Sequence, residues 1–441
     1  KFLIRNMKKI LLMGNGAREH VIAETFMRSE NGCELGVFAK AVNPGLKALA
    51  SAYTTGSFTD FTELKAFAKE FEPDFAFIGP DNPIADGAVD ALLELGIKSV
   101  APVADLARLE SSKSFARDLL KKYEIPGNPE FKVFESEDGI REFMEELGEY
   151  VIKADGLQGG KGVKLSGEHL KNFDEGFAYA QECLQADGRV VIEEKFVGQE
   201  FSLMSFVSGT DVVDMPTVQD HKRAFEGDTG PNTGGMGTWS DSNHSLPFLQ
   251  DSDLLAAHEI TVKVAAAIRE ETGKDFCGIM YGGFIAVKNG VRLIEYNARF
   301  GDPEAMNVLP LLKTDFVELC EAMINGRLSE IDVEFENKAT VVKYVVPEGY
   351  PTNSAKGKKI EVGEIPSGVK TYYASVDERE DGLYLSGSRA IAFVGIADSI
   401  TEAEKLAQSA VGSVTGPVFY RSDIGTADLI QKRLDHMNLL R

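Results

Sequence analysis

The chain has 441 residues, more than one hydrophobic core usually holds, so two to four domains are expected. Hydrophobic residues make up 43% and charged residues 26%, the balance of an ordinary globular protein. A formal net charge of -22 argues against general binding of DNA or RNA, because it repels their phosphate backbones. A local basic pocket for a small phosphorylated ligand is still compatible with this charge.

Cysteine usage predicts a reducing compartment, and hydropathy predicts that the chain has no membrane-spanning segment. The four cysteines lack the paired spacing of a zinc site or a disulfide framework. No apolar run approaches the length of a membrane span, and the first residues lack a signal-peptide pattern. We therefore expect a cytoplasmic protein without a membrane or nucleic-acid partner.

The first part of the chain alternates strand and helix patterns. The predicted elements are a strand at residues 9–13, a helix at 17–26, a strand at 35–39, a helix at 62–71 and a strand at 75–79. This order predicts a doubly wound parallel sheet. Gly14, Asn15 and Gly16 form the turn before the first helix, where exposed backbone amides can hold a phosphate.

A dinucleotide-binding fold is rejected on the same segment. The third glycine of the dinucleotide fingerprint is missing, and Lys40 follows the second strand where an acidic residue for a ribose belongs. Arg18 and Lys40 suit a phosphate-bearing ligand better. Residues 79–82 end another strand and are expected to line the same crevice. The alternative is that these glycines only end the strands and bind no ligand, and this segment alone fits both interpretations equally well.

A helix is predicted from Ser111 or Ser112 to about Tyr123, before Pro126. Lys113 lies in its first turn, where a cation opposes the helix dipole. Two interpretations remain open for this lysine: a ligand anion lies near its ammonium group, or the side chain is simply solvated.

The stretch VIKADGLQGGKGVKL at residues 151–165 carries the strongest nucleotide-binding signal. Lys153 interrupts a short apolar strand, where an unpaired ammonium is costly. A glycine-rich loop then joins this strand to another strand, whereas a Walker loop leads into a helix. Loops of this kind cover the phosphates of ATP, and we prefer this interpretation to a simple hairpin loop. The glycines are Gly156, Gly159, Gly160 and Gly162.

A strand at residues 189–196 ends in a hinge, after which Glu200 opens a further strand. Backbone groups around Glu194, Phe196 and Val197 can contact an adenine edge, and the Glu200 carboxylate can accept hydrogen bonds from ribose hydroxyls. Alone, the segment also fits an ordinary strand–turn–strand with surface glutamates. Its position after the glycine-rich loop favours the nucleotide-binding interpretation.

Residues 219–239 (QDHKRAFEGDTGPNTGGMGTW) form a long polar stretch rich in glycine. A loop of this length inside a compact domain is usually functional or disordered. Asp220 and Lys222 are among the charged residues at its start, and Trp239 is expected to be a packing anchor.

A hairpin around Asn289 and Gly290 is predicted to present Leu293, Glu295 and Asn297 on one face of its second strand. A carboxylate and an amide oxygen this close suit Mg²⁺ or Mn²⁺ bound to phosphates. The alternative is an exposed strand end with ordinary surface charges. Arg299, Asp302 and Glu304 continue the strand into a charged loop.

From about residue 334 the pattern changes to short strands with interleaved helices, at residues 402–411 and 426–440. Few residues there combine into a catalytic arrangement. We expect an α+β domain that covers or supports the site.

Taken in order, five motifs resemble one family closely: GNGAREH, SSKSFARDLL, VIKADGLQGGKGV, QDHKRAFEGDTGPNTGGMGTW and LIEYNARFGDPE. Together they are similar to the phosphoribosylamine–glycine ligases of purine biosynthesis, which belong to the ATP-grasp superfamily. The resemblance runs from about Met7 to the end of the chain. It implies an α/β and α+β multidomain protein, with a doubly wound N-terminal domain at 7–108, an ATP-grasp domain at 109–333 with a mobile lid at 126–192, and a C-terminal α+β domain at 334–441.

The resemblance implies that the chain is a ligase that joins glycine to 5-phosphoribosylamine, while ATP becomes ADP and phosphate. Glycyl phosphate is the implied intermediate, Mg²⁺ or Mn²⁺ the implied metal, and a monomer the expected state. The implied ATP-binding residues are Lys113, Lys153, Gly156, Gly159, Gly160, Gly162, Glu194, Phe196, Val197 and Glu200. The implied substrate-binding residues are Gly14, Asn15, Gly16, Arg18, Asp220 and Lys222. Glu295 and Asn297 are the implied metal ligands, and Arg299 and Lys153 the implied catalytic residues.

The chain departs from the family pattern at Gln158 and Gly159, at Asp81 and Asn82, and at residues 41–42. These departures concern the lid and the N-terminal crevice rather than the reaction class. Two other functions remain to be distinguished: an ATP-grasp enzyme that uses bicarbonate or formate, and a catalytically silent nucleotide-binding module.

Overall fold

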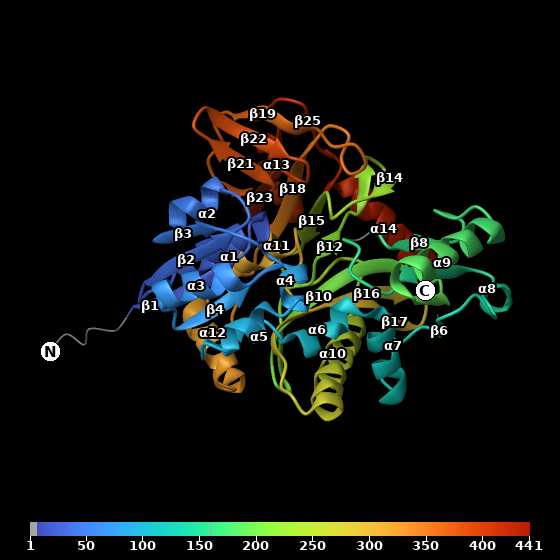
Figure 1. Cartoon of the computed structure of the whole chain (residues 1–441). Coiled ribbons are helices and arrows are strands. Elements are labelled where there is room, and N and C mark those ends of the chain that lie inside the picture. Colours follow the sequence, from blue (N-terminus) through green and yellow to red (C-terminus); the bar gives the residue numbers. More distant parts are fainter. Residues whose placement is uncertain (1–6, 160) are drawn as a thin grey trace.

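The computed structural model describes residues 7–159 and 161–441 (Figure 1). Within these residues no helix is both long enough and apolar enough to cross a membrane. The N-terminal part forms a five-stranded parallel sheet in the order β3-β2-β1-β4-β5, as the alternating pattern predicts. Its elements are β1 (Lys8–Met13), α1 (Ala17–Met27), β2 (Cys33–Ala39), α2 (Pro44–Leu49), β3 (Ala52–Thr55), α3 (Thr62–Phe71), β4 (Phe75–Ile78), α4 (Asp81–Ala85), α5 (Ala88–Leu93) and β5 (Ser99–Val100).

Side chains on β1 show why this sheet is covered on both faces. Ile10 and Leu12 pack into one buried cluster, and Leu11 and Met13 into another, because successive side chains point to opposite faces. Helices therefore flank both sides, and the carboxyl ends of the strands face the middle of the molecule (Figure 1).

Two helices, α6 (Ala104–Ser111) and α7 (Lys113–Lys122), lead from this sheet into a small unit with its own core. The Ser112 hydroxyl caps α7 by accepting the Phe115 N–H at 3.2 Å. The unit is an antiparallel sheet in the order β6-β9-β7-β8, covered by two helices. Its elements are β6 (Phe131–Phe134), α8 (Ile140–Leu147), β7 (Tyr150–Ala154), β8 (Val163–Leu165), α9 (Phe173–Asp187) and β9 (Val190–Glu194). This unit is called the lid below.

The larger half of the central region is an antiparallel sheet in the order β11-β10-β16-β17, against which the long helix α10 packs. Its elements are β10 (Gln199–Ser208), β11 (Asp211–Asp214), α10 (Asp251–Thr272), β16 (Cys277–Val287), β17 (Gly290–Asn297), α11 (Ala305–Val308), η1 (Leu309–Leu311), α12 (Phe316–Ile324) and η2 (Leu328–Glu330). Between β11 and α10 lie four short strands: β12 (Gln219–Asp220), β13 (Arg223–Phe225), β14 (Thr229–Asn232) and β15 (Gly237–Ser240).

The C-terminal region is joined to the central region through a shared sheet in the order β12-β15-β18-β23-β20. β15 pairs with β18, so the glycine-rich stretch becomes an edge of the C-terminal sheet. The helix α14 returns to pack against β10. The elements are β18 (Ala339–Pro347), β19 (Lys356–Val362), β20 (Val369–Tyr373), β21 (Val376–Arg379), β22 (Gly382–Ser386), β23 (Ile391–Ala397), α13 (Ile400–Val411), β24 (Val414–Thr415), β25 (Val418–Phe419) and α14 (Ala427–Leu440).

Candidate active site

A cavity of about 580 Å³ lies where all four parts of the chain meet. The N-terminal part contributes Arg18 of α1 and Asp81 of α4, and the lid contributes residues of its glycine-rich loop. The central sheet contributes β17, and the C-terminal region contributes Arg389 and Arg433. One continuous site is therefore assembled from segments that are far apart in sequence.

Lys153 is neutralised inside a buried ion cluster. Its ammonium pairs with Glu193 on the neighbouring strand and donates to the Ile294 carbonyl at 2.9 Å. Arg117 of α7 approaches the same carboxylate from the other side, with Nε and Oε2 2.8 Å apart. Burial pushes the pKa of Glu193 up, but the two cations outweigh burial and lower it, so this carboxylate is ionised. Burial also lowers the pKa of Lys153 despite the nearby Glu193.

Lys113 connects the start of α7 to the glycine-rich loop. Its ammonium donates to the Gly156 carbonyl at 3.0 Å. Gly159 and Gly162 line the cavity, and Gly159 has a φ of +56°, a conformation that favours glycine. A Cβ on Gly162 would lie 2.6 Å from Cγ of Gln158, so the departure at residue 158 packs directly on this glycine. Gly160 lies outside the described residues.

The hinge after β9 is held by polar contacts of its own. The Glu194 carboxylate pairs with Arg292 at 2.7 Å and accepts the Glu130 N–H at 3.0 Å. The Phe196 ring lies under the Arg292 guanidinium, 4.7 Å from the ring centre. Phe196 lines the cavity, whereas the Val197 side chain is 50% exposed.

Apolar side chains line the cavity beside this hinge, since Val151 pairs with Glu193 and Ile285 with Glu200 on either side of it. We call these apolar lining residues the apolar slot: Val151, Val163, Leu165, Ile285 and Ile294. At its polar end the Glu200 carboxylate is 3.0 Å from the Lys222 ammonium.

Glu295 and Asn297 both line the cavity, but the expected one-face arrangement with Leu293 is wrong. Leu293 is buried in the core, 1% exposed. The pairing of β16 with β17 shifts between Gly283 and Phe284, which leaves Ile294 as an extra residue. Such a β-bulge reverses the alternation of side chains, so Glu295 emerges on the face opposite to Leu293.

The Glu295 carboxylate has no hydrogen-bond or ion-pair partner among the described residues, although four cations surround it. Burial pushes its pKa up, but Lys222, Lys153, Lys113 and Arg299 outweigh burial and lower it. In the described parts of the chain no cluster of three or more His, Cys, Asp or Glu side chains could hold a metal alone. One carboxylate with an amide oxygen still fits an ion such as Mg²⁺, which takes its other ligands from water and substrate phosphates.

Arg299 is fixed at the junction between the central and N-terminal parts. Its guanidinium pairs with Glu110 at 2.9 Å and donates to the Phe300 carbonyl at 3.1 Å. Burial disfavours its charge, but Glu110 and Asp81 reverse this and raise the pKa of Arg299. Its buried Nε atom has no acceptor among the described residues.

The turn before α1 is less open than the sequence predicts. The Gly16 N–H donates to Glu19 Oε2 at 2.7 Å, and the Gly14 N–H donates to the Phe38 carbonyl at 3.0 Å. These two amides are therefore not free for a phosphate, because the chain provides acceptors for both. Asn15 uses its Oδ1 to accept the Ala41 N–H at 3.0 Å.

Arg18 is the member of this group that reaches the cavity. Its Nε pairs with Glu19 at 2.6 Å, and its NH1 donates to the Phe300 carbonyl at 3.3 Å. The guanidinium thus joins α1 to the segment that carries Arg299.

Asp220 and Lys222 line the cavity at the start of the glycine-rich stretch. Burial and the nearby Glu304 raise the pKa of Asp220 well above its usual range. Burial likewise raises the pKa of Glu304, whose Oε1 accepts the Tyr281 hydroxyl at 3.0 Å. Both carboxyls are therefore easier to protonate than an exposed carboxyl. The charge of Glu200 raises the pKa of Lys222, so this ammonium stays charged.

Arg389 is a cavity residue that the sequence does not single out. Its guanidinium donates to the carbonyls of Gly234 at 2.6 Å and Asp302 at 2.8 Å, and so ties the glycine-rich stretch to the segment after β17. Arg117 and Glu110 were not singled out either. Glu193 could have been found from the sequence. It is a carboxylate in an apolar strand, and Lys153 is an ammonium in another apolar strand, so a buried ion pair between the two is expected.

Comparison with known proteins assigns the family. The family described as phosphoribosylglycinamide synthetase matches with its N domain at residues 8–110, its ATP-grasp domain at 111–305 and its C domain at 340–427. The phosphoribosylamine–glycine ligase of Methanosarcina barkeri is 47% identical over 433 residues, which cover 98% of this chain and 100% of that protein. The chain belongs to the phosphoribosylamine–glycine ligase family.

Other relatives of this ligase family agree over nearly the full length. The ligase of Methanocaldococcus jannaschii is 47% identical over 444 residues, covering 98% of this chain and 100% of that protein. The crystal structure of the Thermotoga maritima ligase matches with a TM-score of 0.78 and 30% identity, covering 94% and 99% of the two chains. A biotin carboxylase from Campylobacter jejuni shares only the fold, with a TM-score of 0.73, 16% identity and coverage of 98% and 99%. The ATP-grasp architecture expected from the motifs is confirmed.

Proposed function

We propose that this chain joins glycine to 5-phosphoribosylamine, giving glycinamide ribonucleotide, ADP and phosphate, as a step of purine biosynthesis. Family membership over the whole chain supports the reaction. The observation that carries it is the ionised, unpartnered Glu295 among four cations, in a cavity that also holds an apolar slot. A nucleotide with a divalent ion complements this arrangement, because its phosphates and the ion match the charges and its base matches the apolar lining.

At the nucleotide end, Lys113 and Lys153 contact the phosphates of ATP, and the loop with Gly156, Gly159, Gly160 and Gly162 covers them. The two ammonium groups reach the cavity from different elements, which supports this assignment. Adenine occupies the apolar slot against the hinge at Glu194, Phe196 and Val197. Glu200 accepts hydrogen bonds from the ribose, since its carboxylate lies at the polar end of that slot.

Glu295 and Asn297 hold the divalent cation, either Mg²⁺ or Mn²⁺. ATP-grasp enzymes use ATP with such an ion, and these two oxygen ligands are hard donors of the kind that it prefers. When bound, the ion offsets negative charge on the phosphate oxygens. The Asn297 side chain donates Nδ2 to Glu110 at 3.1 Å, which orients its oxygen away from that carboxylate.

In the first step a glycine carboxylate oxygen attacks the γ-phosphorus, and the bond from phosphorus to the ADP oxygen breaks. Arg299 and Lys153 stabilise the charge on the transferring group, because both cations are buried and fixed by ion pairs. The product is glycyl phosphate, which the lid shields from water.

In the second step the amine of phosphoribosylamine attacks the carbonyl carbon of glycyl phosphate. A carbon–nitrogen bond forms, phosphate leaves with the electron pair of the carbon–oxygen bond, and the amine proton passes to solvent or phosphate. Arg18 is the charged contact for the phosphorylated ribose. It lies beside the turn at Gly14, Asn15 and Gly16, where both glycine amides are already hydrogen-bonded within the chain. Asp220 and Lys222 bind substrate at the opposite wall.

The described cysteines are all free, which supports a reducing compartment such as the cytoplasm.

The deciding experiment measures ADP release with metal, ATP, glycine and phosphoribosylamine, omitting each component in turn. ADP release that depends on glycine and on phosphoribosylamine is expected. Turnover with bicarbonate or formate but without glycine would instead indicate another ATP-grasp enzyme. Nucleotide binding without any substrate-dependent ADP release would indicate a silent module.

A further inference from the structure

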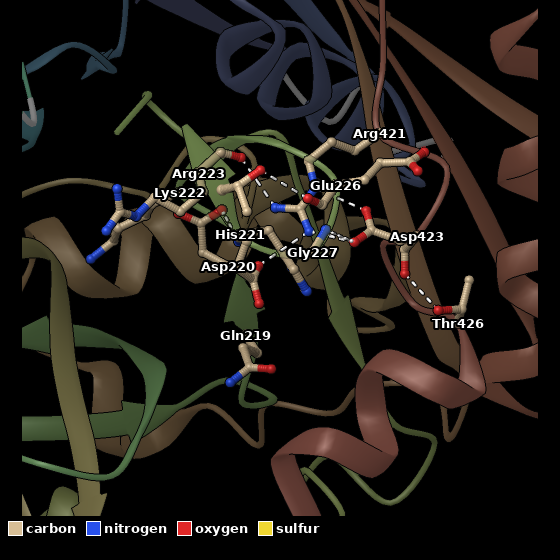
Figure 2. Close-up of polar contacts among 12 residues, drawn as sticks. Gln219, Asp220, His221, Lys222, Arg223, Glu226, Gly227, Arg421, Asp423 and Thr426 are labelled. Atoms are coloured by element: carbon tan, nitrogen blue, oxygen red, sulfur yellow. Dashed lines mark hydrogen bonds and ion pairs between the residues drawn. The ribbon is translucent and has the colours of Figure 1, made fainter. Parts of the chain in front are cut away.

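The turn between β13 and β14 is bound to the segment just before α14 (Figure 2). The Gly227 N–H donates to Asp423 Oδ2 at 2.9 Å. The Ser422 N–H donates to Glu226 Oε1 at 3.1 Å. An isolated two-stranded hairpin is only marginally stable in water, so these contacts fix its position.

Arg421 is the centre of this attachment, and its side chain is only 1% exposed. It donates from Nε to Asp423 Oδ1 at 2.9 Å, from NH1 to the Arg223 carbonyl at 3.1 Å and from NH2 to Asp228 Oδ1 at 3.1 Å. One guanidinium therefore holds the first strand and the turn of the hairpin. We call Arg421, Asp423 and Asp228 the latch.

Arg433 of α14 strengthens the latch from a second element. It donates to Asp228 Oδ2 at 2.6 Å and to Gln219 Oε1 at 3.3 Å. Asp228 thus lies between two guanidinium groups. Burial pushes its pKa up, but Arg433 and neighbouring cations outweigh burial and lower it, so the carboxylate stays ionised.

The latch also surrounds His221, a cavity residue that is 2% exposed. Neither ring nitrogen has a hydrogen-bond partner among the described residues. Burial lowers the pKa of His221 to about 3, and the charges of Arg433 and Arg421 act in the same direction. The imidazole is therefore neutral at physiological pH.

The opposite side of the hairpin contacts the lid. Arg223 NH2 lies 3.0 Å from Glu168 Oε2, and Asn232 Nδ2 lies 3.4 Å from His169 Nε2. Glu168 and His169 both line the cavity. The hairpin consequently bridges the C-terminal domain and the lid.

We propose that Arg421 and Asp423 are positioning residues through which the C-terminal domain holds the hairpin, and with it the lid, over the cavity. Neither residue is among those that line the cavity, so their effect on a ligand passes through Asp228, Arg223 and residues 219–222. The kinetic part of this proposal rests on the proposed function, whereas its structural part does not.

The structural part is tested by limited trypsin digestion of the full chain. Arg421→Lys keeps the charge but loses the planar guanidinium that contacts both the first strand and the turn of the hairpin. Asp423→Ala removes the acceptor of the Gly227 N–H. Cleavage after Lys222 and Arg223 is expected to become about tenfold faster in both variants, because charge-assisted hydrogen bonds that hold the hairpin are lost. Asp398→Asn is the matched control, since Asp398 pairs with Lys338 at the exposed surface of the same domain.

The kinetic part is tested by ADP release at varied ATP concentration. In the two latch variants the KM for ATP is expected to rise about tenfold, with a smaller change in kcat, because the groups that transfer phosphate are intact. Unchanged cleavage and unchanged KM in both variants, or the same changes in Asp398→Asn, would overturn the proposal. If the wild-type chain shows no glycine-dependent ADP release, the proposed function fails while the digestion still decides the latch.

Discussion

Replacing Glu295 by glutamine is the sharpest test of the metal-binding assignment. The substitution keeps the volume and one oxygen but removes the negative charge that faces Lys222, Lys153, Lys113 and Arg299. A divalent ion then loses its only proposed carboxylate ligand and meets four uncompensated cations. We expect kcat to fall by at least about 10³-fold, equivalent to about 4 kcal/mol of transition-state stabilisation.

The cost to folding is expected to be much smaller. The Glu295 side chain forms no hydrogen bond or ion pair with another described residue, so the change breaks no direct contact. What is lost is a favourable interaction with the surrounding cations. This interaction is reflected in the lowered pKa of Glu295. Urea unfolding should therefore show a loss of stability that is smaller than the loss of transition-state stabilisation.

The assay is ADP release over a range of Mg²⁺ and Mn²⁺ concentrations, with Mn²⁺ binding measured separately by calorimetry. Glu259→Gln is the matched control, because Glu259 lies exposed on α10, which packs against the same sheet. The metal assignment is refuted if Glu295→Gln retains about a tenth or more of wild-type kcat with unchanged metal dependence.

Three further changes probe the rest of the cavity. Glu193→Gln leaves Lys153 and Arg117 buried without their carboxylate, so it should destabilise the lid by about 3–5 kcal/mol. Hydrogen exchange of the amides in β7 and β9 measures this loss. The control Glu135→Gln breaks an exposed ion pair with Arg189 and should cost less than about 1 kcal/mol. Because the folded-state pKa of Asp220 is raised, its contribution to stability is present below the ordinary carboxyl pKa of about 3.9 and is lost as pH rises through the folded value. Asp220→Asn should therefore show a smaller fall of unfolding temperature with rising pH than wild type, and an identical profile would contradict the raised pKa. Arg389→Lys loses hydrogen bonds to the carbonyls of Gly234 and Asp302 and should lower kcat/KM about tenfold or more. Wild-type kinetics in this variant would show that Arg389 has no role in the reaction.

Local patterns were sufficient to predict β1, β2 and β4 of the N-terminal sheet and the strands on either side of the glycine-rich loop, whereas the edge strands β3 and β5 were missed. In those segments alternation, glycine turns and caps such as Ser112 act within about ten residues, so each element is specified by its own sequence. The β-bulge at Ile294 shows where this reasoning ends. Nothing in the sequence of β17 marks an extra residue, because the bulge arises from the way β17 pairs with β16.

Contacts between distant segments were also beyond prediction from pattern. Arg389 and Gly234 are 155 residues apart in sequence, and Arg117 reaches Glu193 across 76 residues. A lone arginine near a strand or on a helix is usually solvated, so sequence alone gives no reason to select these. The hydrogen bond from the Gly16 N–H to the Glu19 carboxylate was also not predicted. Glu19 is the third residue of α1, and a glutamate at this position is known to accept the N–H of the N-cap residue.

The charges of the cavity explain why four separate parts of the chain are needed for one site. Glu193 of the lid is balanced by Lys153 of the lid and by Arg117 of α7, which lies outside it. Arg299 of the central region is balanced by Glu110 of α6 and by Asp81 of the N-terminal part. A buried charge without its partner is strongly destabilising, so Arg117 and Arg299 depend on carboxylates that other parts of the chain provide. The charges of the cavity are therefore fully paired only where these parts of the chain pack together.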